Sequence, residues 1–199
     1  MKNQDYLYLD HAASTPMRTS ALEKYVEAES FGFANSSGGH KLSRDSKNLL
    51  EDSREKIAGL FNAAPGEIIF TSGGTEADNW TIKSLFESKK PDDNLVTSNI
   101  EHEAVLASAE WVSINGYQTK YAKSDENGFV SKDEFLNQID DNTKVASLMW
   151  GNNETGVIQP VKDVSKEIKS VNSSTLFHSD VVQGLSLIHI SEPTRHNSI

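Results

Sequence analysis

Short apolar runs alternate with longer amphipathic segments along the chain, and this alternation constrains the fold more than any other feature. Six runs are typical of β-strands: 6–9, 67–72, 95–98, 117–122, 144–150 and 175–180. Five segments between them have apolar residues at helical spacing: 43–61, 75–88, 101–113, 131–139 and 161–171. Strands that alternate with such helices predict βαβ units. The expected fold class is α/β, with a mostly parallel sheet flanked by helices.

Polar residues beyond the strand ends are the first candidates for a functional site. In a parallel sheet of this kind, ligands bind outside the carboxyl ends of the strands. Four segments meet that condition: FTSGGTEADN at 70–79, SNIEHEAVL at 98–106, WGNNETGVIQP at 150–160 and FHSDVVQG at 177–184.

Composition excludes several classes of protein. The formal net charge of −10 gives no electrostatic reason to bind nucleic acid or an anionic membrane surface. The 199 residues include no cysteine, which excludes disulfides, thiolate metal sites and a catalytic thiol within this chain. No residue is assigned to a metal. No apolar run approaches a membrane span, and the first residues lack the pattern of a signal peptide, so a cytoplasmic protein is expected.

The turn at 70–79 has two interpretations. Two glycines and Thr75 lie between an expected strand and an expected helix, where free backbone N–H groups and the helix dipole favour a phosphate. An ordinary glycine turn, capped by Ser72 or Thr75 ahead of the acidic Glu76, explains the same residues. The segment matches neither the dinucleotide-binding pattern nor the P-loop, so both interpretations stay open.

Two further segments are ambiguous when taken alone. His102 follows a strand at a helix start, where it is either a surface histidine or an imidazole that stacks on a planar ligand. Asn152 and Asn153 follow the apolar run at 144–150. They are either turn formers, since Asn tolerates left-handed geometry, or amide donors to a ligand.

The segment FHSDVVQG contains the strongest single candidate, Asp180. Its carboxylate ends an apolar strand, where an unpaired charge is costly and a cationic or protonated nitrogen is a suitable partner. Gln183, three residues later, faces the same ligand in this interpretation. The alternative is that Asp180 caps the following helical turn.

Taken together, the four segments indicate one kind of ligand. A phosphate-binding turn, a stacking histidine, amide donors and a carboxylate suit a planar, phosphorylated molecule with a basic ring nitrogen. Pyridoxal 5′-phosphate (PLP) has these properties, and a carboxylate beside its ring nitrogen keeps the ring protonated as an electron sink.

Longer motifs carry a resemblance to a known family. They are YLDHAASTP ending at Pro16, NSSGGH at 35–40, EIIFTSGGTEADN at 67–79, IEHEAVL at 100–106, NNETGVIQPV at 152–161 and HSDVVQ at 178–183. In this order and spacing the chain resembles the cysteine desulfurases, which are class V, fold-type I PLP enzymes. The resemblance implies the large domain of that fold for residues 16–184, and a contribution to a smaller domain from residues 1–15.

The resemblance also implies roles for individual residues. Gly74 and Thr75 would bind the cofactor phosphate, and His102 would stack on the ring and take part in proton transfer as a catalytic residue. Asp180 would pair with the ring nitrogen. Asn153 and Gln183 would lie at the phenolic oxygen of the cofactor.

The same resemblance implies an activity and partners. Members convert L-cysteine to L-alanine plus an enzyme persulfide, which supplies sulfur to iron–sulfur clusters or to tRNA thiolation. The implied partners are L-cysteine, sulfur-acceptor or scaffold proteins and a second copy in a homodimer, with no direct nucleic acid and no membrane.

The chain departs from the family pattern at Gly184. The family's Schiff-base lysine, nucleophilic cysteine and substrate-binding arginine follow later, whereas this chain has no lysine after Lys169 and no cysteine at all. Residues 185–199 have no helical or strand period, and LSLIHISEPTR matches a translated sequencing-library adapter. The expectation is therefore a truncated large domain with a non-native tail at 185–199, inactive as it stands. Alternatives are another class V enzyme, such as a selenocysteine lyase, or a non-catalytic module that binds a phosphorylated ligand.

Overall fold

The computed structural model describes residues 7–87 and 92–185, which fall into two compact units that divide between Phe70 and Thr71. This boundary lies inside the predicted large domain, residues 16–184. The predicted division of the chain into 1–15, 16–184 and 185–199 stays a prediction. Residues 186–199 of the expected tail lie outside the described residues. Among the described residues, no helix is long and apolar enough to cross a membrane.

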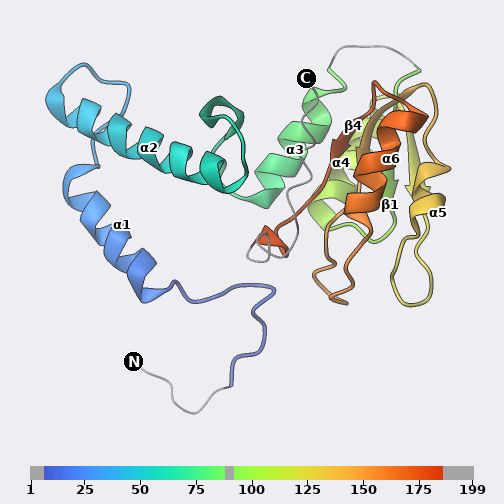
Figure 1. Cartoon of the computed structure of the whole chain (residues 1–199), viewed down its shortest axis with the longest axis horizontal. Helices are drawn as coiled ribbons and strands as arrows, with labels where there is room; N and C mark the ends of the chain where they lie inside the picture. Colours follow the sequence, from blue (N-terminus) through green and yellow to red (C-terminus); the bar gives the residue numbers. More distant parts are fainter. Residues whose placement is uncertain (1–6, 88–91, 186–199) are drawn as a thin grey trace. The chain divides into compact units, whose positions relative to one another are not determined.

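The first unit contains two helices and a short 3₁₀ turn: α1 Thr19–Phe31, α2 Lys41–Leu60 and η1 Pro65–Glu67 (Figure 1). His40 caps α2 through its side chain, which accepts a hydrogen bond from the Ser43 N–H. Helix α1 is not among the predicted helices, and it has no buried residue. Leu60, one of the apolar residues in the predicted helix at 43–61, is 61% exposed.

The strands predicted at 6–9 and 67–72 are wrong for the described residues. Residues 7–9 and 68–72 form no strand, and Tyr6 lies outside the described part of the chain. A strand persists only where a neighbouring strand accepts its backbone hydrogen bonds. Neither segment has such a neighbour among the described residues, because the four-stranded sheet is formed by other segments.

The second unit is a parallel sheet with helices on both faces, which confirms the predicted α/β class (Figure 1). The strand order is β2-β1-β3-β4. The elements are α3 Gly74–Ser84, β1 Asn94–Ser98, α4 Glu103–Ile114, β2 Gln118–Ala122, α5 Lys132–Leu136, β3 Thr143–Ser147, α6 Val161–Val171 and β4 Leu176–His178.

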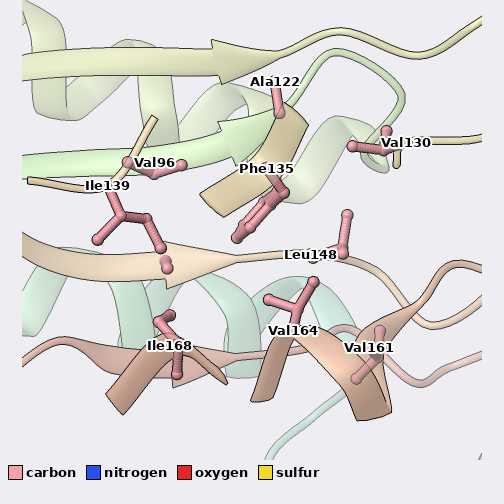
Figure 2. Close-up of a cluster of buried hydrophobic side chains, with 10 residues drawn as sticks. Val96, Ala122, Val130, Phe135, Ile139, Leu148, Val161, Val164 and Ile168 are labelled. Atoms are coloured by element: carbon pink, nitrogen blue, oxygen red, sulfur yellow. The ribbon is translucent and has the colours of Figure 1, made fainter. Parts of the chain in front are cut away.

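Two apolar clusters cover the two faces of this sheet, because neighbouring residues of a strand point to opposite sides. Leu95 and Val145 pack with residues of α3 and α4, including Ile82, Val105 and Val112. The opposite cluster packs against α5 and α6, and Figure 2 shows its side chains gathered between the strands and these helices. It comprises Val96, Ala122, Val130, Phe135, Ile139, Ala146, Leu148, Val161, Val164 and Ile168.

The strand order reverses between β1 and β3. From β1 the chain passes through α4 to β2 on one side, and from β3 it passes through α6 to β4 on the other. Loops that leave adjacent strands in opposite directions create a crevice at their carboxyl ends, which is where open α/β sheets bind ligands. The fold therefore places a candidate site beyond Ser98 and Ser147.

Candidate functional site

Hydrogen bonds and close packing join the loops that follow β1, β3 and β4. The Trp150 N–H donates to the Asp180 carbonyl at 2.8 Å. The Asn152 side-chain amide donates to the Ile100 carbonyl, also at 2.8 Å. A Cβ added to Gly184 would lie 2.5 Å from the Trp150 ring, so the absence of a side chain at Gly184 permits this approach. The predicted site residues His102, Asn153, Asp180 and Gln183 all lie in or next to these loops.

The start of α3 is open to an anion. Its N-cap is Gly73, and no side chain caps the helix, so the predicted alternative of a Ser72 or Thr75 cap is wrong. Glu76 instead accepts hydrogen bonds at 2.6 Å from the N–H and the hydroxyl of Ser72, which lower the pKa of Glu76. No side chain therefore caps the first N–H groups of the helix, beginning at Gly74, and uncapped groups of this kind favour an anion.

Gly74 also lies against the turn that follows β4. A Cβ added there would lie 2.8 Å from a methyl group of Val182. The start of α3 and the turn after Asp180 therefore belong to one edge of the second unit. The exposed Thr75 hydroxyl lies beside Gly74 at the same helix start.

Asp180 is 9% exposed, and one of its carboxylate oxygens already accepts a hydrogen bond. Its Oδ1 accepts the Val182 N–H at 2.9 Å, so the predicted capping role is present. Its Oδ2 makes no hydrogen bond with a described residue. The capping bond is thus compatible with the ligand-binding interpretation, which stays a prediction, and Gln183 lies half-buried in the same turn.

His102 caps α4 with its ring. Nδ1 accepts a hydrogen bond from the Ala104 N–H at 3.1 Å. A neutral ring in this arrangement carries its proton on Nε2, and the side chain is otherwise exposed. The imidazole is thus held in one orientation and one tautomer, with Nε2 free to face a ligand.

The two adjacent asparagines have different environments, and one of them is a turn former. Asn152 Oδ1 accepts the N–H groups of Glu154 and Thr155 at 2.9 and 2.8 Å, so Asn152 is the turn former. Gly156 closes the turn with a φ of 73°, a conformation that favours glycine. Asn153 is half-buried, and its side chain makes no hydrogen bond within the described part of the chain.

Glu101 joins the carboxyl ends of β1 and β3 at the point where the strand order reverses. Its Oε1 accepts the Ser98 hydroxyl at 2.6 Å and the Met149 N–H at 2.9 Å, and its Oε2 is buried without a partner among the described residues. Burial raises the pKa of Glu101 to about 8. The negative charges of Asp180 and Asp78 also raise this pKa, whereas the two hydrogen bonds lower it. The carboxyl is therefore protonated at neutral pH.

A second buried polar group lies on the α3 side of the sheet. His178 Nδ1 is 2.9 Å from the Ser147 hydroxyl, and His178 Nε2 is 3.4 Å from Asp78 Oδ1. Ser147 is fully buried and Asp78 is 4% exposed. A carboxylate so shielded is stabilised by a nearby donor or cation, and the His178 ring is the group that lies beside Asp78.

Glu101, Asp78 and His178 are not among the site residues predicted from the sequence. A signal existed for Asp78, because it lies four residues before the buried Ile82 and so shares the inward face of α3. His178 interrupts an apolar run, which is another signal of a special environment. Nothing in the local pattern distinguishes Glu101 from exposed residues such as Glu103.

Comparison with known proteins gives one family. The family model described as aminotransferase class-V matches residues 7–192. Among curated proteins, the chain is 37% identical over 185 residues to the cysteine desulfurase IscS of Methanosarcina thermophila, covering 92% of this chain and 45% of that protein. It is 36% identical over 185 residues to the IscS of Clostridium botulinum, covering 92% and 46%. The chain therefore spans about half the length of these relatives.

Solved structures agree with this result. A NifS-like protein superimposes with a TM-score of 0.86 at 35% identity, covering 89% of this chain and 49% of that one. The structure described as SspA in complex with cysteine has a TM-score of 0.83 at 32% identity, covering 89% and 51%.

Proposed function

Because the chain belongs to the aminotransferase class-V family, we propose that it forms the N-terminal half of a PLP-dependent cysteine desulfurase. Such an enzyme transfers the sulfur of L-cysteine to a cysteine of its own and leaves L-alanine. The relatives reported above are named for this activity, and the chain spans about half their length. The activity is accordingly proposed for a longer protein, and these 199 residues provide part of its cofactor site.

The Asp180 carboxylate is the observation that carries this proposal. It is buried, its Oδ1 is engaged by the Val182 N–H, and its Oδ2 makes no hydrogen bond with a described residue. A carboxylate in such a place is stabilised by a nearby cation. A protonated pyridine nitrogen is a planar cation that suits this position.

The other predicted residues complete a set of groups that fits PLP. The start of α3, at Gly74 and Thr75, offers uncapped N–H groups and a hydroxyl to a phosphate. The Asn153 amide and the half-buried Gln183 are suited to an oxygen on the ring. PLP, when bound, supplies an electron sink for carbanion chemistry.

His102 is the catalytic residue of the proposal. Its ring stacks on a planar ligand, and Nε2 is the atom that gives up or accepts a proton, since Nδ1 is occupied by the Ala104 N–H. The chain contains no cysteine, so no residue of it is assigned to persulfide formation. We expect this chain alone to bind the cofactor without turning over L-cysteine.

The wider setting is part of the same proposal. The longer protein acts as a homodimer in the cytoplasm and passes sulfur to acceptor or scaffold proteins for iron–sulfur clusters or tRNA thiolation. Neither a membrane nor a nucleic acid is a direct partner in this proposal.

Titration of the 199-residue chain with PLP tests the site. We expect saturable, dialysable binding that quenches tryptophan fluorescence, and Asp180→Asn weakens it about tenfold through loss of a charge-assisted hydrogen bond. The matched control is Asp141→Asn, an exposed aspartate before β3 at the opposite edge of the sheet. Equal affinity of Asp180→Asn and the wild type contradicts the proposal.

Sequencing of the gene across codon 184 tests the assignment to a desulfurase. A frame that continues into a lysine motif and later a cysteine supports it. A frame that reads LSLIHISEPTRHNSI and stops excludes the desulfurase reaction for this gene product. A continuing frame that lacks the cysteine favours another class V enzyme.

A further inference from the structure

Asp78 and His178 link two parts of the site that lie far apart in the sequence. Asp78 is four residues after Gly74, at the start of α3. His178 ends β4, two residues before Asp180. The 3.4 Å contact between His178 Nε2 and Asp78 Oδ1 therefore connects the proposed phosphate-binding end of the site to the carboxylate at its other end.

The contact is shielded from water. The side chains of His178 and Asp78 are 14% and 6% exposed. Among the described residues, His178 is the one partner that the Asp78 carboxylate has. Polar interactions are screened little by water in such a place, so the position of the imidazole beside Asp78 matters more than it would at the surface.

Ser147 restrains the other side of the imidazole. Residues 147 and 178 are direct neighbours in the β3–β4 ladder, and the Ser147 hydroxyl lies 2.9 Å from Nδ1. The ring thus has a hydrogen bond with Ser147 at Nδ1 and a close polar contact with Asp78 at Nε2. The ring therefore cannot rotate without losing a contact.

We propose that His178 is a positioning residue that couples the start of α3 to Asp180, and so keeps the binding groups for the phosphate and the ring nitrogen of one PLP molecule at a fixed separation. The identity of the ligand rests on the function proposed above, whereas the coupling rests on the contacts of His178 alone. Two anchoring groups held in advance at the correct separation lose less entropy when the ligand binds.

Amide hydrogen exchange of the 199-residue chain without ligand tests the coupling. In His178→Leu we expect about tenfold faster exchange both at Ala77, the first protected amide of α3, and at Val182, which donates to Asp180. His178→Gln keeps a donor near the position of Nε2 and restores slow exchange at Ala77. Amides of α6 serve as the control and stay unchanged. Faster exchange at Val182 alone, or equal effects of the two substitutions, overturns the proposal.

A cycle of variants tests the consequence for PLP. We expect Asp180→Asn to weaken PLP binding about tenfold in the wild type but less than about threefold in His178→Leu. In His178→Leu the Asp180 carboxylate is displaced and already contributes little to binding, so its removal has a smaller effect. Equal losses in both backgrounds overturn the proposal. If His178→Leu does not fold, Asp78→Asn alters the other side of the same contact with a smaller change in volume. If the wild-type chain binds no PLP while the exchange result holds, the proposed cofactor is wrong and the coupling stands.

Discussion

Replacement of Glu101 by glutamine makes the second unit more stable at neutral and higher pH. The folded protein raises the pKa of this carboxyl from 4.5 to about 8, since burial disfavours its charge. The protonated form therefore favours folding. The contribution of Glu101 to the free energy of unfolding is largest below about pH 4.5. It declines as the pH rises towards 8 and then levels off.

The size of the effect follows from the same values. Each tenfold change in a proton equilibrium corresponds to about 1.4 kcal/mol, so a rise from 4.5 to about 8 costs up to about 5 kcal/mol at alkaline pH. The side-chain amide of the Glu101→Gln variant would stay neutral at every pH. It would keep an acceptor oxygen for the Ser98 hydroxyl and the Met149 N–H. The wild type should therefore lose stability between pH 5 and 8 by a large share of this amount, and Glu101→Gln should not.

Urea unfolding followed by tryptophan fluorescence measures this difference in the right part of the chain. All three tryptophans, Trp80, Trp111 and Trp150, lie in the second unit. The matched control is Glu103→Gln, which removes an exposed carboxylate from the helix that follows β1. Parallel pH profiles for the wild type and Glu101→Gln would refute the reasoning, as would a loss of pH dependence in Glu103→Gln.

Three further predictions concern packing and turns. Gly184→Ala should cost about 1–3 kcal/mol and shift the tryptophan emission, since its Cβ would lie 2.5 Å from the Trp150 ring; an unchanged spectrum contradicts this contact. Phe135→Ala should cost about 3–5 kcal/mol in urea unfolding, because the side chain is fully buried in the cluster of Figure 2; a loss below about 1 kcal/mol contradicts that burial. Asn152→Ala should lower the thermal midpoint by removing about 1–3 kcal/mol of turn bonds, whereas Asn153→Ala should leave it unchanged; equal midpoints refute the division of roles.

The strands and helices of the second unit could be predicted because their signals are local. Val161, Val164 and Ile168 recur at helical spacing and are all buried in α6. The apolar run around Val145 is covered on both faces, as a central parallel strand requires. The same local reasoning failed at 67–72, since an apolar run becomes a strand only beside a pairing partner.

The candidate site could be predicted in outline only. Polar residues after the strands marked one edge of the sheet, and Asp180 and His102 lie there. Which of Asn152 and Asn153 serves the turn depends on the position of the Ile100 carbonyl, 52 residues away from Asn152. No pattern within a short window contains that information.

The sequence by itself determined the α/β class, the edge of the sheet that carries the polar loops, and the kinds of side chain found there, because hydrophobic period and composition are properties of neighbouring residues. Only the tertiary structure decided the burial of Glu101 against Met149, 48 residues away, and the meeting of Asp78 with His178. Desolvation and the contacts of buried charges depend on which distant segments cover a residue. Those effects exist only once the sheet and its helices have assembled.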